Sequence, residues 1–494
     1  MKRTFFIIAV LSLFITGCSK RETIVTGQIT GINHQTLVYT VPVSGTGFLG
    51  FNDTLKIDET GTFELKFAIT QPVFVTMWIP EPYKQVKLLL EPGNNYHVIL
   101  DTTNDDIQIS GANEKGQMLY VTLPNPGFIE MEGRSLLKDT SLLLIHEKID
   151  KLKQDDLNKF KELLDNKEIS PSFFRLVQTD RDCYYASLES RISIIKIYRL
   201  IRNENDRYSP ENEDDLLKNL TNLEAIYTQY PPEEARLTFS TFWPEYAEYY
   251  VKDYKQYIKK DFDVNHYIES MRKKAFIINE SKEYLTGKTL EFFQARYLFF
   301  ESYQSNFEKE LIALFGQFKE DYPQSEYSKY LAPLIDKIVL YHQIVAQPFN
   351  EAVSFPDNYE DINTLEEAIK PLKGKKIYID VWATWCGPCK KEFENNDALK
   401  KILAEDHIQQ LYISIDEDIR DQQWKDGIKF YNLTGNHIRT NKLFYADLMK
   451  RYDKKDGTYI SIPWYILVDE NGTIIAEHAK SPSQLIAGET LIQK

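Results

Sequence analysis

Short runs of alternating polar and apolar residues fill the part of the chain that follows an N-terminal apolar segment. Residues 62–67 alternate strictly, as a strand with one buried face does. Turn signals such as Asp58–Gly61 and Glu91–Asn94 separate these runs. The pattern predicts strands at residues 23–32, 35–43, 53–58, 62–69, 73–79, 86–90, 96–101 and 107–110. We therefore expect residues 23–132 to form an all-β sandwich or barrel.

The apolar residues take up the 3.6-residue period of helices from about residue 133. Predicted helices are 136–164, 171–202, 211–229, 232–262 with an interruption near Pro244, 266–278, 289–303, 306–318 and 324–344. This predicts a central α-helical region over residues 133–345. The region is rich in Tyr and Phe, and two interpretations stay open. The aromatic residues form the core of a helical bundle, or they form a binding platform for peptide or unfolded substrate.

Strands and helices alternate after residue 346, which is typical of an α/β fold. Predicted strands are 377–381, 410–416, 463–469 and 473–478, and predicted helices are 363–371, 390–404, 420–431, 441–452 and 482–492. The Asn-Gly pair within Asp469–Gly472 is a strong hairpin signal. We therefore expect a C-terminal α/β domain over residues 346–494.

The first 22 residues have the pattern of a targeting segment. Two basic residues precede the apolar run Phe5–Ile15, which is too short for a membrane span of about 18 or more residues. The sequence Ile15-Thr16-Gly17-Cys18 then resembles a bacterial lipobox. This implies a signal peptide over residues 1–17, a lipid on Cys18, and an anchor or linker over residues 18–22. The alternative is an ordinary cleaved signal peptide.

The residue after Cys18 bears on localisation. By the same resemblance, Ser19 implies sorting to the outer membrane, and no acidic cluster follows it. We therefore expect a lipid-anchored protein of the cell envelope that faces the periplasm.

The composition is that of a folded, acidic protein. Of its 494 residues, 43% are hydrophobic and 13% aromatic, which is enough for several packed cores, and the net charge of -14 argues against a nucleic-acid partner. The cysteines are too few for a disulfide framework, and the scattered histidines give no metal-ligand spacing. Cys183 lies within a predicted helix, as a buried inert thiol or as a regulatory or resolving thiol.

The candidate chemistry lies in Cys386-Gly-Pro-Cys389, between a predicted strand and a predicted helix. A CxxC in this position is typical of a thiol–disulfide redox site. The spacing lets the two sulfurs form a disulfide with little backbone strain. The first sulfur faces the positive end of the helix, which favours its thiolate. The expected redox group is thus the Cys386–Cys389 disulfide, with no further cofactor and no metal.

The segment Asp380–Cys389, DVWATWCGPC, resembles the thioredoxin active site. The Gly374-Lys-Lys lead-in, the insertion before Ile462-Pro463 and the Val468-Asp-Glu-Asn-Gly hairpin resemble the TlpA/ResA-type exported branch of thioredoxin-like proteins. The resemblance covers residues 346–494 and implies a thioredoxin fold there. The order of a β-domain, a helical region and a thioredoxin domain also resembles a lipoprotein group of anaerobic bacteria.

The resemblance implies a role for each residue of the site. Cys386 is the exposed attacking thiolate, and Cys389 is the buried resolving thiol. Asp380 is a buried carboxyl below Cys389 that accepts its proton, with a pKa raised by burial. The alternative is an incidental strand residue, although a lone acid in so apolar a strand is costly without a task.

The resemblance also implies substrate-binding residues, namely Trp385, Gly387, Pro388, Ile462 and Pro463. Pro463 matches the cis-proline of the family, beside which an extended substrate pairs. Ile462 is the residue of reducing thioredoxins, whereas the TlpA/ResA branch often has Thr, which leaves the substrate class open. Gly-Pro between the cysteines is typical of reducing members, with thioredoxin at about -270 mV.

Together these features predict a membrane-tethered thiol–disulfide oxidoreductase that reduces protein disulfides in the periplasm. Because a periplasm is kept oxidising, the predicted partners are disulfide-containing proteins and a membrane thiol electron donor. Cytochrome c biogenesis and repair of wrong disulfides are two uses that fit. A disulfide isomerase or oxidase, or a chaperone-like binding protein with a regulatory redox pair, are the alternatives.

Overall fold

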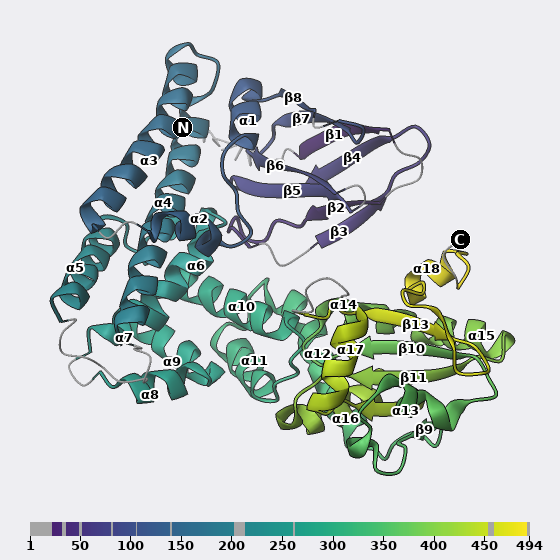
Figure 1. Ribbon diagram of the computed structural model, residues 1–494. Coiled ribbons are helices and arrows are strands. Elements are labelled where there is room, and N and C mark those ends of the chain that lie inside the picture. Colours follow the sequence, from purple (N-terminus) through teal and green to yellow (C-terminus); the bar gives the residue numbers. More distant parts are fainter. Residues whose placement is uncertain are drawn as a thin grey trace, which may run out of the picture. The chain divides into compact units, whose positions relative to one another are not determined.

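The computed structural model describes residues 22–31, 36–48, 52–80, 83–104, 106–138, 141–201, 213–259, 262–452 and 459–491 (Figure 1). The predicted signal peptide and the predicted lipid-attachment residue Cys18 lie outside these described residues. The chain divides after Asp336 into two compact units. The first unit contains strands followed by helices, and the second is α/β.

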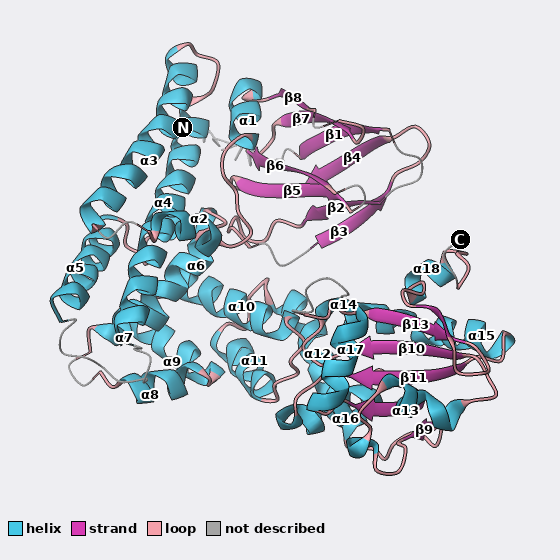
Figure 2. Cartoon of the chain, viewed as in Figure 1, coloured by secondary structure: helices cyan, strands magenta, loops and turns pink. Residues whose placement is uncertain are grey.

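Eight strands open the N-terminal unit, and each corresponds to a predicted strand (Figure 2). They are β1 (Thr23–Thr30), β2 (Thr36–Thr40), β3 (Asn52–Lys56), β4 (Thr62–Phe67), β5 (Val73–Ile79), β6 (Lys84–Leu90), β7 (Asn95–Asp101) and β8 (Ile107–Gly111). One sheet has the order β4-β1-β7-β8, and the other has the order β3-β2-β5-β6. Strands β1 and β7 pair in parallel, whereas the other neighbours in these sheets pair antiparallel.

The two sheets share one hydrophobic core, so the fold is a sandwich, one of the two predicted forms. Val25 and Phe63 of one sheet join Val75 and Leu88 of the other in this core. Burial alternates along β1 and β4, because only one of their faces is covered. Strands β5 and β6 are buried almost throughout, since helices cover their second face.

Helices follow in the rest of the N-terminal unit, and the division after Asp336 falls within the last of them. They are α1 (Glu114–Val121), α2 (Ile129–Leu136), α3 (Leu142–Asp165), α4 (Pro171–Ile201), α5 (Glu213–Gln229), the 3-10 helix η2 (Ala235–Phe239), α6 (Trp243–Glu248), the π-helix η3 (Tyr249–Tyr254), α7 (Lys255–Tyr257), α8 (Val264–Met271), α9 (Lys274–Tyr284), α10 (Gly287–Tyr303), α11 (Glu310–Asp321) and α12 (Ser328–Val345). Among the described helices, none combines the length and the apolar character that crossing a membrane requires.

The helical region begins earlier than predicted, at Glu114 rather than at residue 133. The sequence of α1 contains Gly116 and gives little helical periodicity. The helix forms against the sheet, because the side chain of Gln117 bonds both the N–H and the carbonyl of Leu89 in β6. Tertiary packing thus stabilises a helix that the local helix propensity of this segment did not predict.

A buried polar network joins the sandwich to the helices. The ammonium of Lys87 in β6 donates to Thr241 at 2.7 Å. Asp180 in α4 accepts hydrogen bonds from the neighbouring Arg181 and from Ser240 at 2.7 Å each. Buried charges are tolerated only with partners, so this network fixes the two regions together. The predicted boundary between residues 132 and 133 therefore falls inside one compact unit, and the next division lies at residue 336 rather than 345.

The C-terminal unit is an α/β domain with one six-stranded sheet of order β14-β13-β10-β11-β12-β9. Its strands are β9 (Val353–Ser354), β10 (Ile377–Trp382), β11 (Gln409–Ser414), β12 (Gly435–Arg439), β13 (Trp464–Val468) and β14 (Ile474–Ala476). Its helices are η4 (Tyr359–Asp361), α13 (Leu365–Ile369), η5 (Lys370–Leu372), α14 (Gly387–Glu392), η6 (Phe393–Asn395), α15 (Asn396–Glu405), η7 (Asp418–Arg420), α16 (Asp421–Phe430), α17 (Lys442–Tyr452) and α18 (Pro482–Ile486). The strands β9 and β12 were not predicted from the sequence.

Candidate active site

Strand β10 carries the chain to the two cysteines. All six of its residues are buried, as expected for an interior strand with helices on both faces. It pairs in parallel with β11 and antiparallel with β13. The end of β10, the end of β11 and the start of β13 therefore lie at one edge of the sheet. Cys386 follows β10 at this edge.

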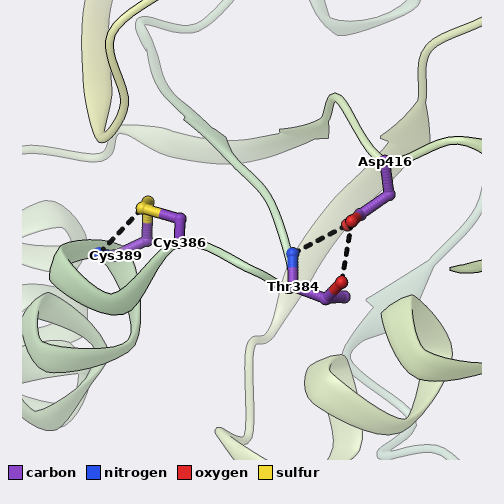
Figure 3. Close-up of a disulfide and its surroundings, with 4 residues drawn as sticks. All are labelled: Thr384, Cys386, Cys389 and Asp416. Carbon is purple, nitrogen blue, oxygen red and sulfur yellow. Dashed lines mark hydrogen bonds between the residues drawn. A yellow bond between two sulfur atoms is a disulfide. The ribbon is translucent and has the colours of Figure 1, made fainter. Parts of the chain in front are cut away.

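Cys386 and Cys389 form a disulfide across the first turn of α14 (Figure 3). The sulfurs are 1.96 Å apart and the Cα atoms 5.3 Å apart. Cys386 is the N-cap residue of the helix, and the backbone N–H of Cys389 donates to its sulfur at 3.1 Å. An N–H that points at this sulfur stabilises a thiolate there once the disulfide is reduced.

The two sulfurs differ less in exposure than predicted. Cys389 is fully buried, whereas Cys386 keeps 4% of its surface. The prediction of an exposed Cys386 is therefore wrong for the disulfide form, because both cysteines belong to the hydrophobic core that contains Trp382 and Ile460. Cys386 is thus the less deeply buried of the two cysteines.

Asp380 is buried in the middle of β10, with 1% of its surface exposed. Burial, and secondarily the charge of Glu392, raises the pKa of the Asp380 carboxyl well above its usual value. Its Oδ1 has no hydrogen-bond partner among the described residues. A raised pKa brings this carboxyl closer to the pKa of a thiol than an ordinary aspartate is. Proton transfer between the carboxyl and a thiol therefore costs less free energy.

Tyrosines surround Asp380 and supply the apolar environment. In the sheet, Asp380 lies opposite Tyr412 of β11 and Tyr465 of β13. The Tyr378 ring stacks on Tyr465 with centroids 5.6 Å apart. The hydroxyl of Tyr412 donates to the Asn396 side chain at 3.0 Å, away from the carboxyl. The rings therefore exclude water from the Asp380 carboxyl, and its Oδ1 receives no hydrogen bond from the described residues.

Glu392 is a site residue that the sequence analysis missed. It lies three residues after Cys389, at the end of α14. Its carboxylate accepts from the backbone N–H of Ser483 at 2.9 Å and from the Ser483 hydroxyl at 2.8 Å. These bonds hold the carboxylate at the start of α18, within electrostatic range of Asp380. The spacing of one helical turn from Cys389 was the available signal.

A second missed acid, Asp416, holds the loop before Cys386 in place. It is buried just after β11 and accepts from the N–H of Thr384 at 2.8 Å and from the Thr384 hydroxyl at 2.7 Å (Figure 3). The Ser414 hydroxyl also donates to it, at 2.8 Å. Two bonds to one residue fix the chain two positions before Cys386. No local sequence signal marks this contact, because Thr384 and Asp416 are 32 residues apart.

The predicted substrate-binding residues lie at the same edge of the sheet. Trp385 is 54% exposed beside Cys386, and Gly387 and Pro388 form the exposed first turn of α14. The Ile462-Pro463 bond is cis, as predicted, and it directly precedes β13. Since Trp464 of β13 pairs with Val381, this bond lies at the disulfide end of β10. Their binding of substrate stays a prediction.

Cys183 belongs to α4 of the N-terminal unit, whereas the disulfide belongs to the C-terminal unit. It is fully buried, and burial raises the pKa of its thiol far above the usual value. A buried thiol of this kind is inert, which agrees with the first of the two predicted roles. Among the described residues, no group of three or more His, Cys, Asp or Glu is placed to hold a metal ion.

Comparison with known proteins places the similarity in the C-terminal unit. Residues 346–486 match the Redoxin family. Thiol-disulfide oxidoreductase ResA of Bacillus thuringiensis is 28% identical over 117 residues, which are 24% of this chain and 62% of that protein. Sporulation thiol-disulfide oxidoreductase A of Bacillus subtilis is 30% identical over 110 residues, 22% of this chain and 62% of that protein. The chain thus spans less than two thirds of the length of these curated relatives.

Among solved structures, the solution structure of a putative thiol-disulfide oxidoreductase from Bacteroides vulgatus shares 32% identity with this chain. The match covers 25% of this chain and 75% of that one, with a TM-score of 0.20. The crystal structure of StoA from Bacillus subtilis shares 28% identity, covering 24% of this chain and 83% of that one, with a TM-score of 0.19.

Proposed function

We propose that this protein is a membrane-tethered thiol–disulfide oxidoreductase that reduces protein disulfides, because residues 346–486 form a thioredoxin-like domain of the TlpA/ResA type. The observation that carries the proposal is the Cys386–Cys389 disulfide at the start of a helix, with Cys386 less deeply buried than Cys389. The names of the curated relatives, thiol-disulfide oxidoreductases, support the reaction class.

The reaction starts from the dithiol form. The Cys386 thiolate, stabilised by the Cys389 N–H, attacks one sulfur of the substrate disulfide. A bond forms between Cys386 and that sulfur, and the other substrate sulfur leaves as a thiolate that takes up a proton. The product of this step is a mixed disulfide between Cys386 and the substrate.

Cys389 then resolves the mixed disulfide. Its thiol loses a proton, and its sulfur attacks the sulfur of Cys386, releasing the second substrate thiol. The protein ends as the Cys386–Cys389 disulfide, which is the form that the structure contains. Two electrons have passed to the substrate; one of its two new protons balances the proton lost by Cys389 and the other comes from the solvent. A dithiol donor then has to reduce the protein before the next turnover.

Asp380 acts as the proton acceptor for Cys389 in this proposal. Proton transfer is most effective when acceptor and donor have similar pKa values. The raised pKa of Asp380 brings this carboxyl toward the range of a thiol, and the fully buried Cys389 has few other acceptors. Glu392 tunes this acceptor through its charge.

The tether and the direction of electron flow rest on the sequence. Lipid attachment at Cys18 places the protein in the cell envelope, where the surroundings are oxidising and a membrane thiol donor supplies electrons. The outer membrane is the expected site on the basis of Ser19. A Cys18→Ala variant should no longer incorporate labelled palmitate when it is made in cells, and a variant that still incorporates the label would exclude this tether.

Reduction of insulin disulfides with dithiothreitol as donor tests the proposed reaction. The wild-type protein should accelerate insulin reduction, and Cys386→Ser should abolish the acceleration. Cys183→Ser is the matched control, since that thiol is buried in the other unit, and it should retain full activity. Activity that survives in Cys386→Ser would refute the proposal. A Cys389→Ala variant should trap substrates as mixed disulfides and so identify them.

The reduction potential of the disulfide distinguishes a reductase from an enzyme that works in the opposite direction, as an oxidase or isomerase. A value near that of thioredoxin, about -270 mV, supports a reductase, whereas a value of about -120 to -180 mV supports an oxidase or isomerase. Equilibration of the purified protein with defined glutathione or dithiothreitol buffers measures this potential directly.

A further inference from the structure

The helical part of the N-terminal unit contains a cavity of about 900 Å³. Its lining residues come from helices α2, α4, α6, α7, α8 and α10 and from the π-helix η3. Figure 1 labels these six α-helices. Pockets for small molecules typically have volumes of about 300–1,000 Å³, so this cavity is large enough for one. None of its residues belongs to the disulfide site.

Aromatic and other apolar side chains line much of this cavity. Phe293 and Tyr297 of α10 are buried in its wall. Phe128 and Met131, at the start of α2, are 60% and 65% exposed. Large apolar side chains that are this exposed beside a cavity form a surface for an apolar ligand. Contact between the two surfaces removes both from water and so favours binding.

Two arginines in the wall keep N–H groups that have no acceptor. Arg191 donates to Glu130, but its buried Nε has no hydrogen-bond partner among the described residues. Arg296 makes no hydrogen bond or ion pair with any described residue, and its guanidinium lies 5.0 Å from the centre of the Phe300 ring. Burial lowers the pKa of Arg296, so the nearby carboxylates do not compensate for its desolvation.

The two guanidinium groups act on one part of the wall. Both Arg191 and Arg296 exert an electrostatic effect on the carboxyl of Glu245. They therefore converge from helices α4 and α10 toward the same region of the cavity. Unpaired donors that converge in this way need a shared or neighbouring acceptor.

Three carboxylates of the wall already have donors. The donor and acceptor pairs are Arg134 and Arg191 with Glu130, Lys252 with Glu248, and Tyr267 with Asp253. Burial, and secondarily the charge of Glu248, raises the pKa of the Glu245 carboxyl, which disfavours its charged, accepting form. In the part of the chain that the structure describes, no hydrogen bond joins these carboxylates to Arg296, so a ligand that completes the hydrogen bonds of this arginine has to bring acceptor atoms.

We propose that this cavity binds an amphipathic anion, a small molecule with a carboxylate or phosphate head group on an apolar body. The head group accepts hydrogen bonds from Arg296 and Arg191, whose planar guanidinium groups match either kind of oxyanion. The apolar body lies against Phe293 and Tyr297 and extends toward Phe128 and Met131. A cationic amphiphile would leave both guanidinium groups without acceptors.

Calorimetric titration of the full-length protein tests the proposal with four probes of equal chain length, each below its micellar concentration. Decanoate and decyl phosphate carry the two anionic head groups, and comparing them separates the carboxylate from the phosphate. Decanol and decyltrimethylammonium are the neutral and cationic controls. We expect at least one anion to bind at least tenfold more tightly than both controls. Equal binding of decanol or of the cation would overturn the proposal.

The variant Arg296→Met keeps the aliphatic stem of the side chain and removes its donors. Binding of the anion should weaken at least tenfold, whereas Arg175→Met, which removes an exposed arginine of α4 outside the cavity, should bind as the wild type does. Unchanged binding in Arg296→Met would contradict the proposal.

A second measurement separates binding from a structural role. Without ligand, Arg296→Met should melt at the wild-type temperature or above it, because a desolvated cation without a partner has been removed. A lower melting temperature would show that the charge has a structural partner and would overturn the assignment. None of these measurements requires turnover, so their failure is distinct from failure of the proposed redox function.

Discussion

Replacing Asp380 by Asn gives a direct test of the electrostatics of the site. Asp380 is buried in β10, and burial together with the charge of Glu392 raises the pKa of its carboxyl. An acid with a higher pKa in the folded than in the unfolded chain makes the fold less stable as pH rises. Asn has nearly the same size and does not titrate. The variant should therefore gain stability relative to the wild type as pH rises.

The magnitude follows from proton linkage. The unfolded carboxyl titrates near pH 3.8, so above that pH the unfolded chain releases a proton that the folded chain retains. Between that pH and the raised pKa, the wild type loses about 1.4 kcal/mol of unfolding free energy per pH unit relative to the variant. Above the raised pKa the difference stays constant. The stabilisation of the wild type is complete below the unfolded pKa and is lost as pH rises through the window.

Guanidinium unfolding of the oxidised proteins at several pH values measures this difference. Trp382, Trp424 and Trp464 are buried in the C-terminal unit, and their fluorescence reports its unfolding. The unfolding free energy of Asp380→Asn minus that of the wild type should grow as pH rises above 5, with a slope of at most about 1.4 kcal/mol per pH unit, until the raised pKa is passed. A difference that is independent of pH from 5 to 8, or one that shrinks as pH rises, would refute the reasoning.

Asp469→Asn is a control of opposite sign in the same unit. Asp469 accepts hydrogen bonds from the backbone N–H groups of Thr473 at 2.7 Å and Asn471 at 2.9 Å. These bonds lower the pKa of Asp469. Its contribution is present above the unfolded pKa and is lost as pH falls through the lowered one. This variant should therefore be less stable than the wild type at neutral pH, and the deficit should disappear in acid.

Three further predictions concern the chemistry and its support. Glu392→Gln removes the charge that helps to raise the pKa of Asp380, so the pH profile of insulin reduction should shift to lower pH; an unshifted profile would exclude the coupling. Asp416→Ala leaves the donors of Ser414 and Thr384 without an acceptor. It should lower the unfolding free energy, measured by denaturant titration, by about 1–3 kcal/mol. An unchanged unfolding free energy would show that these contacts are dispensable. Trp385→Ala should change stability by no more than about 0.5 kcal/mol, because the ring is 54% exposed. It should raise KM for insulin about fivefold, or ~1 kcal/mol, without slowing reduction of a small disulfide, and an unchanged KM would remove Trp385 from substrate binding.

The fold could be predicted where the pattern of apolar residues is regular. All eight strands of the sandwich were predicted, since alternation and turn residues mark them. Strand β12 was missed because its sequence, GNHIR, is polar. Inside the domain, His437 is buried, its Nε2 lies 2.9 Å from the carbonyl oxygen of Leu433, and burial lowers its pKa to about 3. Packing thus made a buried strand from residues that usually lie outside.

The division into units was beyond the reach of the sequence pattern for a similar reason. The change from strand to helix periodicity predicted a domain boundary near residue 132. The Lys87 ammonium and the Asp180 carboxylate come from the two sides of that boundary, and both are buried in one network. A change of secondary structure is visible along the chain, whereas a shared core is visible only in three dimensions.

The sequence by itself determined the chemistry of the redox pair, because the disulfide and its place at a helix start depend on residues only three positions apart. It also indicated Asp380 and the cis bond before Pro463, since these belong to a recognisable local pattern. The tertiary structure alone decided which acids support the site. Asp416 meets Thr384 across 32 residues, and Glu392 reaches the neighbourhood of Asp380 through the packing of separate elements. Local spacing fixes which atoms can bond within a turn, whereas burial and long-range pairing depend on how distant segments pack.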